Sequence, residues 1–174
     1  MESEINIVQK SQQYRQSARL FWNAGIEQAT EFVAVDRDKS GDDLTQPIVG
    51  RGAAYADIDA DGDLDILLTQ IAGPPLLLRN DLEQKHNFAR FKLIGTADNR
   101  DAIGAWIDLR IGSRQWSKQV MPTRSYLSQV ELPVTFGLGN ETRIDEVFVR
   151  WPGGDRQKLD NIKLNATNIV TQGQ

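Results

Sequence analysis

The chain has 174 residues, which is enough for one domain of ordinary size or for two small β modules that share a core. Its apolar fraction of 40% and charged fraction of 25% are those of a folded protein, and a formal net charge of −4 without a basic cluster argues against nucleic acid as a partner. The absence of cysteine excludes disulfides, zinc–thiolate sites and thiol catalysis. The apolar runs are too short to span a bilayer, and the polar N-terminal residues show no signal peptide.

The first part of the chain divides into a polar lead-in and a β-rich unit. Residues 1–30 are predicted to be the lead-in, either helical or extended. Residues 31–84 contain short apolar runs separated by polar loops and by a Gly-Pro-Pro breaker at residues 73–75. These runs cover residues 32–35, 48–56, 64–69 and 76–80, and we expect each to form a strand.

The strand pattern becomes regular in residues 85–174. Ile107, Leu109 and Ile111 alternate with polar residues and should share one buried face, while Gly112 and Ser113 are typical of a tight hairpin turn. Further strands are expected at residues 88–94, 115–120, 134–139, 147–151, 162–164 and 169–171. Short strands separated by Gly, Pro, Asn and Asp predict an all-β sandwich or barrel.

An aspartate-rich loop is the most informative motif of the chain. Calcium takes roughly six to eight oxygen ligands in a flexible geometry, and a glycine lets a loop that carries such ligands turn sharply. Carboxylates this close would repel one another without a cation. Gly62 follows the third of five alternating aspartates. The spacing predicts a calcium site formed by Asp57, Asp59, Asp61, the backbone carbonyl of Asp63, and Asp65.

Other metal sites fit this loop less well. Position 12 is Leu68 where an EF-hand has glutamate, and the flanking residues have strand character. Magnesium prefers six rigid positions and retains its waters, and zinc is disfavoured because His86 is the one histidine and cysteine is absent.

A second acidic loop has a similar rhythm. It offers Asp36, Asp38, Ser40 and Asp42 as ligands, but Arg37 and Lys39 neutralise it. It therefore predicts either a second cation site or an ordinary polar turn.

The sequence resembles two known families. Residues 50–67, which include the aspartate loop, look like an FG-GAP/VCBS repeat, the calcium-loop repeat of integrin-type propellers. Residues 99–105, 125–129, 136–139 and 149–154 resemble motifs of the ASPIC/UnbV domain. This order is similar to the C-terminal end of the cartilage acidic proteins and their bacterial homologues.

The resemblance implies calcium binding at Asp57, Asp59, Asp61, Asp63 and Asp65, an antiparallel β-sandwich over residues 85–174, and an extracellular or cell-surface setting. Relatives carry many repeats, whereas this chain has one clear copy. We therefore expect one or two propeller-blade-like β units joined to the sandwich.

The sequence favours a binding module over an enzyme. His86 stands in a polar turn without a paired nucleophile, and the aspartates are better explained as metal ligands. We expect a calcium-stabilised interaction or adhesion module with a protein or glycan partner. One alternative is a carbohydrate- or matrix-binding module that uses exposed aromatics, for which Trp22, Trp106, Trp116 and Trp151 are candidates. Another is a self-assembling β protein, since exposed edge strands can self-associate.

Overall fold

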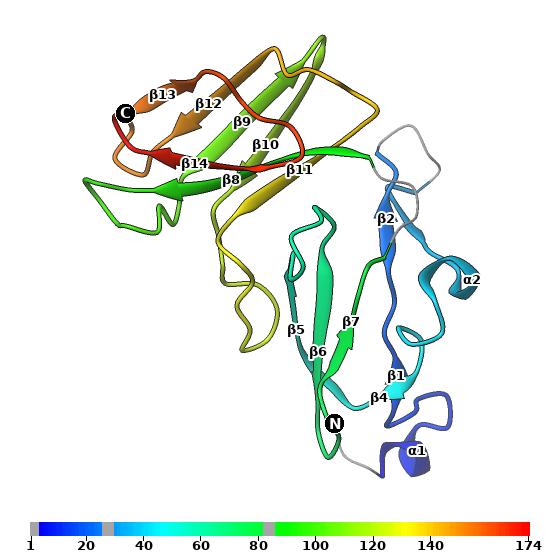
Figure 1. Cartoon of the computed structure of the whole chain (residues 1–174). Helices are drawn as coiled ribbons and strands as arrows, with labels where there is room; N and C mark the ends of the chain where they lie inside the picture. The colour runs from blue at the N-terminus through cyan, green and yellow to red at the C-terminus, as the bar shows by residue number, and fades with distance from the viewer. Residues whose placement is uncertain (1–3, 26–29, 82–85) are drawn as a thin grey trace. The chain divides into compact units, whose positions relative to one another are not determined.

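A computed structural model of the chain describes residues 4–25, 30–81 and 86–174 (Figure 1). Strands account for 42% of these residues and helices for 4%, which confirms the predicted all-β fold class. The described part of the chain has two helices, α1 (Ile5–Val8) and α2 (Arg37–Ser40), and neither has the length or the apolar sequence of a membrane-spanning helix. The strands are β1 (Gln16–Ser17), β2 (Phe21–Asn23), β3 (Phe32–Ala34), β4 (Pro47–Ile48), β5 (Gly50–Ala56), β6 (Asp65–Gln70), β7 (Leu76–Leu78), β8 (Asn87–Ile94), β9 (Trp106–Ile111), β10 (Arg114–Gln119), β11 (Val134–Gly139), β12 (Glu146–Arg150), β13 (Arg156–Leu159) and β14 (Thr167–Thr171).

The chain forms two compact units. The first contains Met1–Ala53 and Ile66–Leu78, and the second contains Ala54–Asp65 and Arg79–Gln174. The aspartate loop thus belongs to the second unit. The predicted boundary between residues 84 and 85 lies outside the described residues, as do residues 1–3 and 26–29 of the predicted lead-in, so the three-part division of the sequence stays a prediction.

The first unit has small sheets and a small core. Strands β1 and β4 form one antiparallel pair, β2 and β3 form another, and β5, β6 and β7 form a three-stranded sheet. Val49 is buried near the start of this sheet, whereas Phe21, Trp22 and Phe32 of the β2–β3 pair are more than half exposed. Few apolar side chains are therefore withdrawn from water here.

The second unit is a sandwich of two sheets (Figure 1). One sheet has the order β10-β9-β12-β13 and is antiparallel throughout. The other has the order β11-β8-β14, in which β14 runs parallel to β8. Arg114 pairs with Ile111 across the turn between β9 and β10, which confirms the hairpin predicted at Gly112 and Ser113.

Alternation along the strands builds the core between these sheets. Ile107 and Leu109 of β9 are completely buried, as predicted, and pair with the buried Val149 and Val147 of β12. From the other sheet, the ring of Phe91 meets that of Phe136 edge-to-face, with centroids 5.9 Å apart. Burial of apolar surface at about 25 cal/mol per Å² is the main stabilising contribution of such a core.

The outer face of the four-stranded sheet carries a charged pair. Arg150 Nε donates to Asp108 Oδ2 at 2.7 Å and Arg150 Nη2 donates to Asp108 Oδ1 at 3.2 Å, while Ser117 Oγ also donates to Asp108. The hydrogen bond from Arg150 lowers the pKa of Asp108 below its ordinary value of 3.8, although burial opposes the shift.

This lowered pKa predicts part of the acid sensitivity of the fold. A carboxylate whose pKa is lower in the folded state stabilises the fold above its unfolded pKa, and that contribution is lost as pH falls through the folded value. We expect Asp108→Asn to reduce stability near pH 6 and to flatten the loss of stability below about pH 4. Thermal unfolding midpoints measured from about pH 6 to below about pH 4 test this prediction. Asp160→Asn, a substitution of an exposed aspartate, is the control. If the stability of Asp108→Asn fell with decreasing pH as steeply as that of the natural chain, the lowered pKa of Asp108 would not contribute to acid sensitivity and the prediction would be wrong.

Candidate metal centre

The aspartate loop connects β5 to β6 through two residues with left-handed backbone. Ala60 has φ 61° and Gly62 has φ 99°. A Cβ atom at Gly62 would lie 2.2 Å from Cε1 of the Phe88 ring, a distance at which atoms overlap. Gly62 is therefore required both by the turn and by the close approach of the loop to β8.

The loop brings three predicted ligands together. One carboxylate oxygen from each of Asp57, Asp59 and Asp61 lies within 4.8 Å of the others. The side chain of Asp57 is only 2% exposed, and its Oδ1 is buried without a hydrogen-bond partner. A buried carboxylate oxygen without a partner is costly, and a cation at this position would satisfy it.

The two later aspartates shape the loop. Asp65 is 3% exposed, and its two oxygens accept hydrogen bonds from the backbone N–H groups of Ile58 at 3.0 Å and Asn80 at 2.9 Å. The backbone N–H of Asp63 donates to Asp61 Oδ1 at 3.0 Å. The structure thus places Asp65 as a brace that closes the loop, whereas Asp57, Asp59 and Asp61 form the cluster itself.

A buried arginine holds the loop against the three-stranded sheet of the sandwich. Arg90 of β8 points away from the core, yet its side chain is only 9% exposed. Its guanidinium is paired with both oxygens of Glu131, donates to Thr135 Oγ1 at 2.9 Å, and lies 3.4 Å from Asp57 Oδ2. Glu131 in turn accepts the backbone N–H of Asp57 at 3.2 Å.

Sequence reasoning missed Arg90 and Glu131. The alternation along β8 places Arg90 on an outward position, where an arginine is ordinarily solvated. Glu131 lies 41 residues further along the chain, so the pair arises from tertiary structure. The available signal was limited to the charge of Arg90 inside the apolar run Phe88–Leu93.

A second arginine contacts the cluster at the surface. Arg79 Nη2 lies 2.6 Å from Asp59 Oδ2 and 2.6 Å from Asp81 Oδ1, and these side chains are substantially exposed. An exposed pair of this kind contributes little to stability.

The earlier acidic loop is arranged differently. Residues Arg37–Ser40 form the single turn α2, with Asp36 at its N-cap, and Arg37 Nε lies 2.7 Å from Asp42 Oδ1. Within residues 4–25, 30–81 and 86–174, three carboxylate or histidine ligands lie close enough to share a metal ion only at Asp57, Asp59 and Asp61. The carboxylates of Asp36, Asp38 and Asp42, which were predicted to form a second site with Ser40, are not clustered in this way.

Comparison with known proteins concerns the sandwich. The family model described as ASPIC and UnbV matches residues 95–174. This part of the chain is similar to the ASPIC/UnbV family. The match begins at residue 95, after the aspartate loop. The resemblance of residues 50–67 to an FG-GAP/VCBS repeat therefore remains a hypothesis, as does the resemblance of the whole chain to the cartilage acidic proteins. No curated protein matches the chain.

The contacts of Arg90 predict that its charge is required for stability. In Arg90→Met, the carboxylates of Asp57 and Glu131 would remain buried without their shared cation. Removing one partner of a buried ion pair typically costs about 3–5 kcal/mol. We expect a loss of that size in the free energy of unfolding, measured with urea in the presence of chelator.

Arg79→Met is the matched control, because it removes an arginine that pairs with the same loop at the surface. Its expected cost is about 0–1 kcal/mol. Equal losses in the free energy of unfolding for Arg79→Met and Arg90→Met would contradict the claim that the buried ion pairs of Arg90 contribute more to stability than the surface pair.

Proposed function

We propose that this chain is a calcium-binding interaction or adhesion module of the extracellular type, in which the cation stabilises the attachment of the aspartate loop to the sandwich. The observation that carries the proposal is Asp57 Oδ1, an oxygen buried without a partner beside the carboxylates of Asp59 and Asp61. The similarity of residues 95–174 to the ASPIC/UnbV family supports the extracellular type of module.

The charges around the loop support a divalent cation. Asp57, Asp59 and Asp61 bring three negative charges into one small volume. Arg90 lies 3.4 Å from Oδ2 of Asp57 but is shared with Glu131, and Arg79 pairs with Asp59 but is shared with Asp81. Because each arginine is shared with another carboxylate, a cation with two charges would offset the repulsion that remains among the three aspartates.

Calcium fits this donor set better than magnesium or zinc. The candidate ligands are carboxylates and backbone carbonyls on a loop, which suit the flexible, oxygen-rich coordination of calcium. Zinc prefers nitrogen and sulfur ligands, and the one histidine, His86, is an exposed residue immediately before β8.

The cation would act on structure rather than on a reaction. Asp57 is linked to the sandwich through its backbone N–H to Glu131 and through Arg90. A cation bound to Asp57, Asp59 and Asp61 would therefore link the exposed part of the loop to Asp57, which Arg90 of β8 holds on the sandwich. We propose a binding role and not catalysis for these aspartates.

Calcium should raise the stability of the chain in a saturable way. A ligand that binds only the folded state stabilises it by RT ln(1 + [L]/Kd), about 2.7 kcal/mol at a hundredfold excess over Kd. We expect the thermal midpoint to rise when calcium is titrated to millimolar concentration after chelator treatment, and to rise less with magnesium.

Asp61→Asn should abolish this rise, because the amide keeps the hydrogen bond from Asp63 but removes a charged ligand. The exposed Asp101→Asn of the sandwich is the control and should respond to calcium like the natural chain. A midpoint that ignores calcium, or one that rises equally in Asp61→Asn, would refute the proposal.

A further inference from the structure

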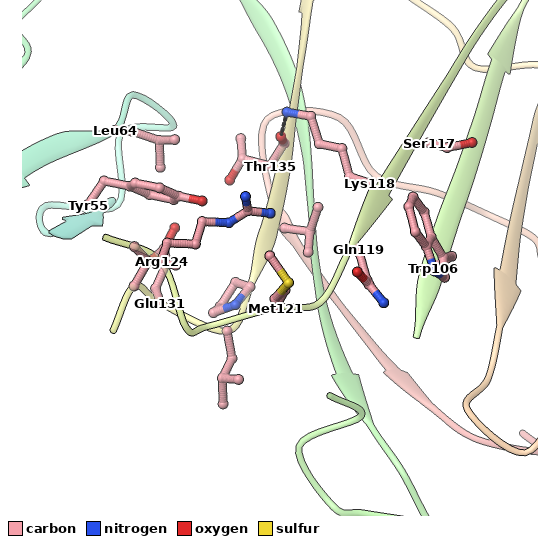
Figure 2. Close-up of a pocket in the computed structure, with 14 residues that line it drawn as sticks. Tyr55, Leu64, Trp106, Ser117, Lys118, Gln119, Met121, Arg124, Glu131 and Thr135 are labelled. Atoms are coloured by element: carbon pink, nitrogen blue, oxygen red, sulfur yellow. Dashed lines mark hydrogen bonds between the residues drawn. The ribbon is translucent and has the colours of Figure 1, made fainter. Parts of the chain in front are cut away.

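A pocket in the second unit carries two cationic side chains. Its volume is about 530 Å³, within the range of roughly 300–1,000 Å³ that is typical of small-molecule sites. Lys118 of β10 and Arg124 of the following loop line it, together with residues of β9 and β11. Figure 2 shows both side chains extending toward the segment of β11 that contains Thr135.

Lys118 meets neutral groups and another cation. Its Nζ donates to the backbone carbonyl of Thr135 at 2.7 Å and lies 5.2 Å from the centre of the Phe136 ring. Burial lowers the pKa of Lys118, and the nearby charge of Arg124 lowers it further. Two like charges that face one open space, without an anion between them, favour an anionic ligand.

The loop that carries Arg124 is held in a defined shape. Thr123 and Gln129 form a bridge that closes it. Ser125 and Leu127 have φ of 64° and 47°, a backbone conformation that costs energy for residues other than glycine. Arg124 of this loop lines the pocket.

The carboxylate in the pocket wall does not neutralise the two cations. In the described part of the chain, neither Lys118 nor Arg124 has a carboxylate oxygen within 4.0 Å. Glu131 also lines the pocket, but Arg90 pairs with both of its oxygens. The three cations Lys118, Arg124 and Arg90, against the two carboxylates Glu131 and Asp57, leave one net positive charge. This balance suits a monoanion such as a carboxylate better than a phosphate dianion.

The remaining lining suits a sugar ring. Trp106 and Tyr55 supply aromatic surface, and Ser117 and Gln119 supply a hydroxyl and an amide that can exchange hydrogen bonds with hydroxyl groups. The guanidinium of Arg150 lies 5.4 Å from the centre of the Trp106 ring and fixes its position. Ser117 Oγ already donates to Asp108, and Gln119 Nε2 donates to the backbone carbonyl of Gly104 at 3.3 Å. The hydroxyl oxygen and the amide oxygen can still accept hydrogen bonds from the hydroxyl groups of a ligand.

We propose that this pocket binds a sugar acid, with Lys118 and Arg124 holding its carboxylate and Trp106 contacting its ring. None of the residues that line the pocket is one of the five aspartates predicted to bind calcium. The inference therefore goes beyond the calcium proposal and can fail or succeed separately from it.

Calorimetric titration of the full chain with glucuronate tests the proposal, and glucose is the neutral comparison. We expect saturable binding of glucuronate and none of glucose at the same concentrations. Arg124→Met and Lys118→Met should each weaken glucuronate binding at least tenfold. Lys92→Met, which removes an exposed lysine from β8, should leave it unchanged.

Each alternative outcome overturns the proposal. Absence of glucuronate binding to the natural chain is one such outcome. Equal binding of glucuronate by Arg124→Met is another, because this substitution lies on an exposed loop and should not affect folding. Binding of N-acetylglutamate, a carboxylate without a sugar ring, with the same affinity as glucuronate would contradict the assignment of a sugar acid. Repeating the titration in chelator separates this result from the calcium proposal, since loss of calcium leaves Lys118 and Arg124 in place.

Discussion

The shared salt bridge of Arg90 with Asp57 and Glu131 is the constraint on which the second unit depends. Burying three charged groups on the outer face of a sheet is unfavourable unless they are paired closely. Here the pairing joins three segments that are distant in sequence: the aspartate loop, β8, and the segment before β11. Because Gly62 lets the loop approach Phe88 of the same strand, geometry and charge act together to place the loop on the sheet.

This arrangement explains why the aspartate loop is anchored to the sheet and still has one buried carboxylate oxygen without a partner. Arg90 satisfies one oxygen of Asp57 and leaves the other buried without a partner. Asp65 closes the loop through backbone hydrogen bonds, so the loop keeps its shape while its ligands face one another. The calcium proposal follows from that division of roles. On the other side of Glu131, the same ion pair removes a negative charge from a pocket and leaves Lys118 and Arg124 available to an anion.

Local patterns were predictable from sequence and tertiary pairings were not. The alternation in Ile107–Ile111, the turn at Gly112 and the spacing of the aspartates each depend on neighbouring residues, and the structure contains the first two as predicted. Burial of Arg90, the parallel pairing of β14 with β8, and the strained loop around Arg124 depend on contacts between distant segments. From sequence alone, an arginine at an outward strand position is predicted to be exposed, and its burial becomes apparent only when its ion-pair partners are known.

Calcium titration by isothermal calorimetry tests the central claim most directly. For the chelator-treated chain, the account predicts about one calcium ion bound per chain, by analogy with single-loop sites. Asp57→Asn should abolish this binding because it removes the charge of the buried carboxylate whose Oδ1 has no partner. Absence of calcium binding in the natural chain, or undiminished binding in Asp57→Asn, would contradict the account and leave the loop as a structural element held by Arg90 alone.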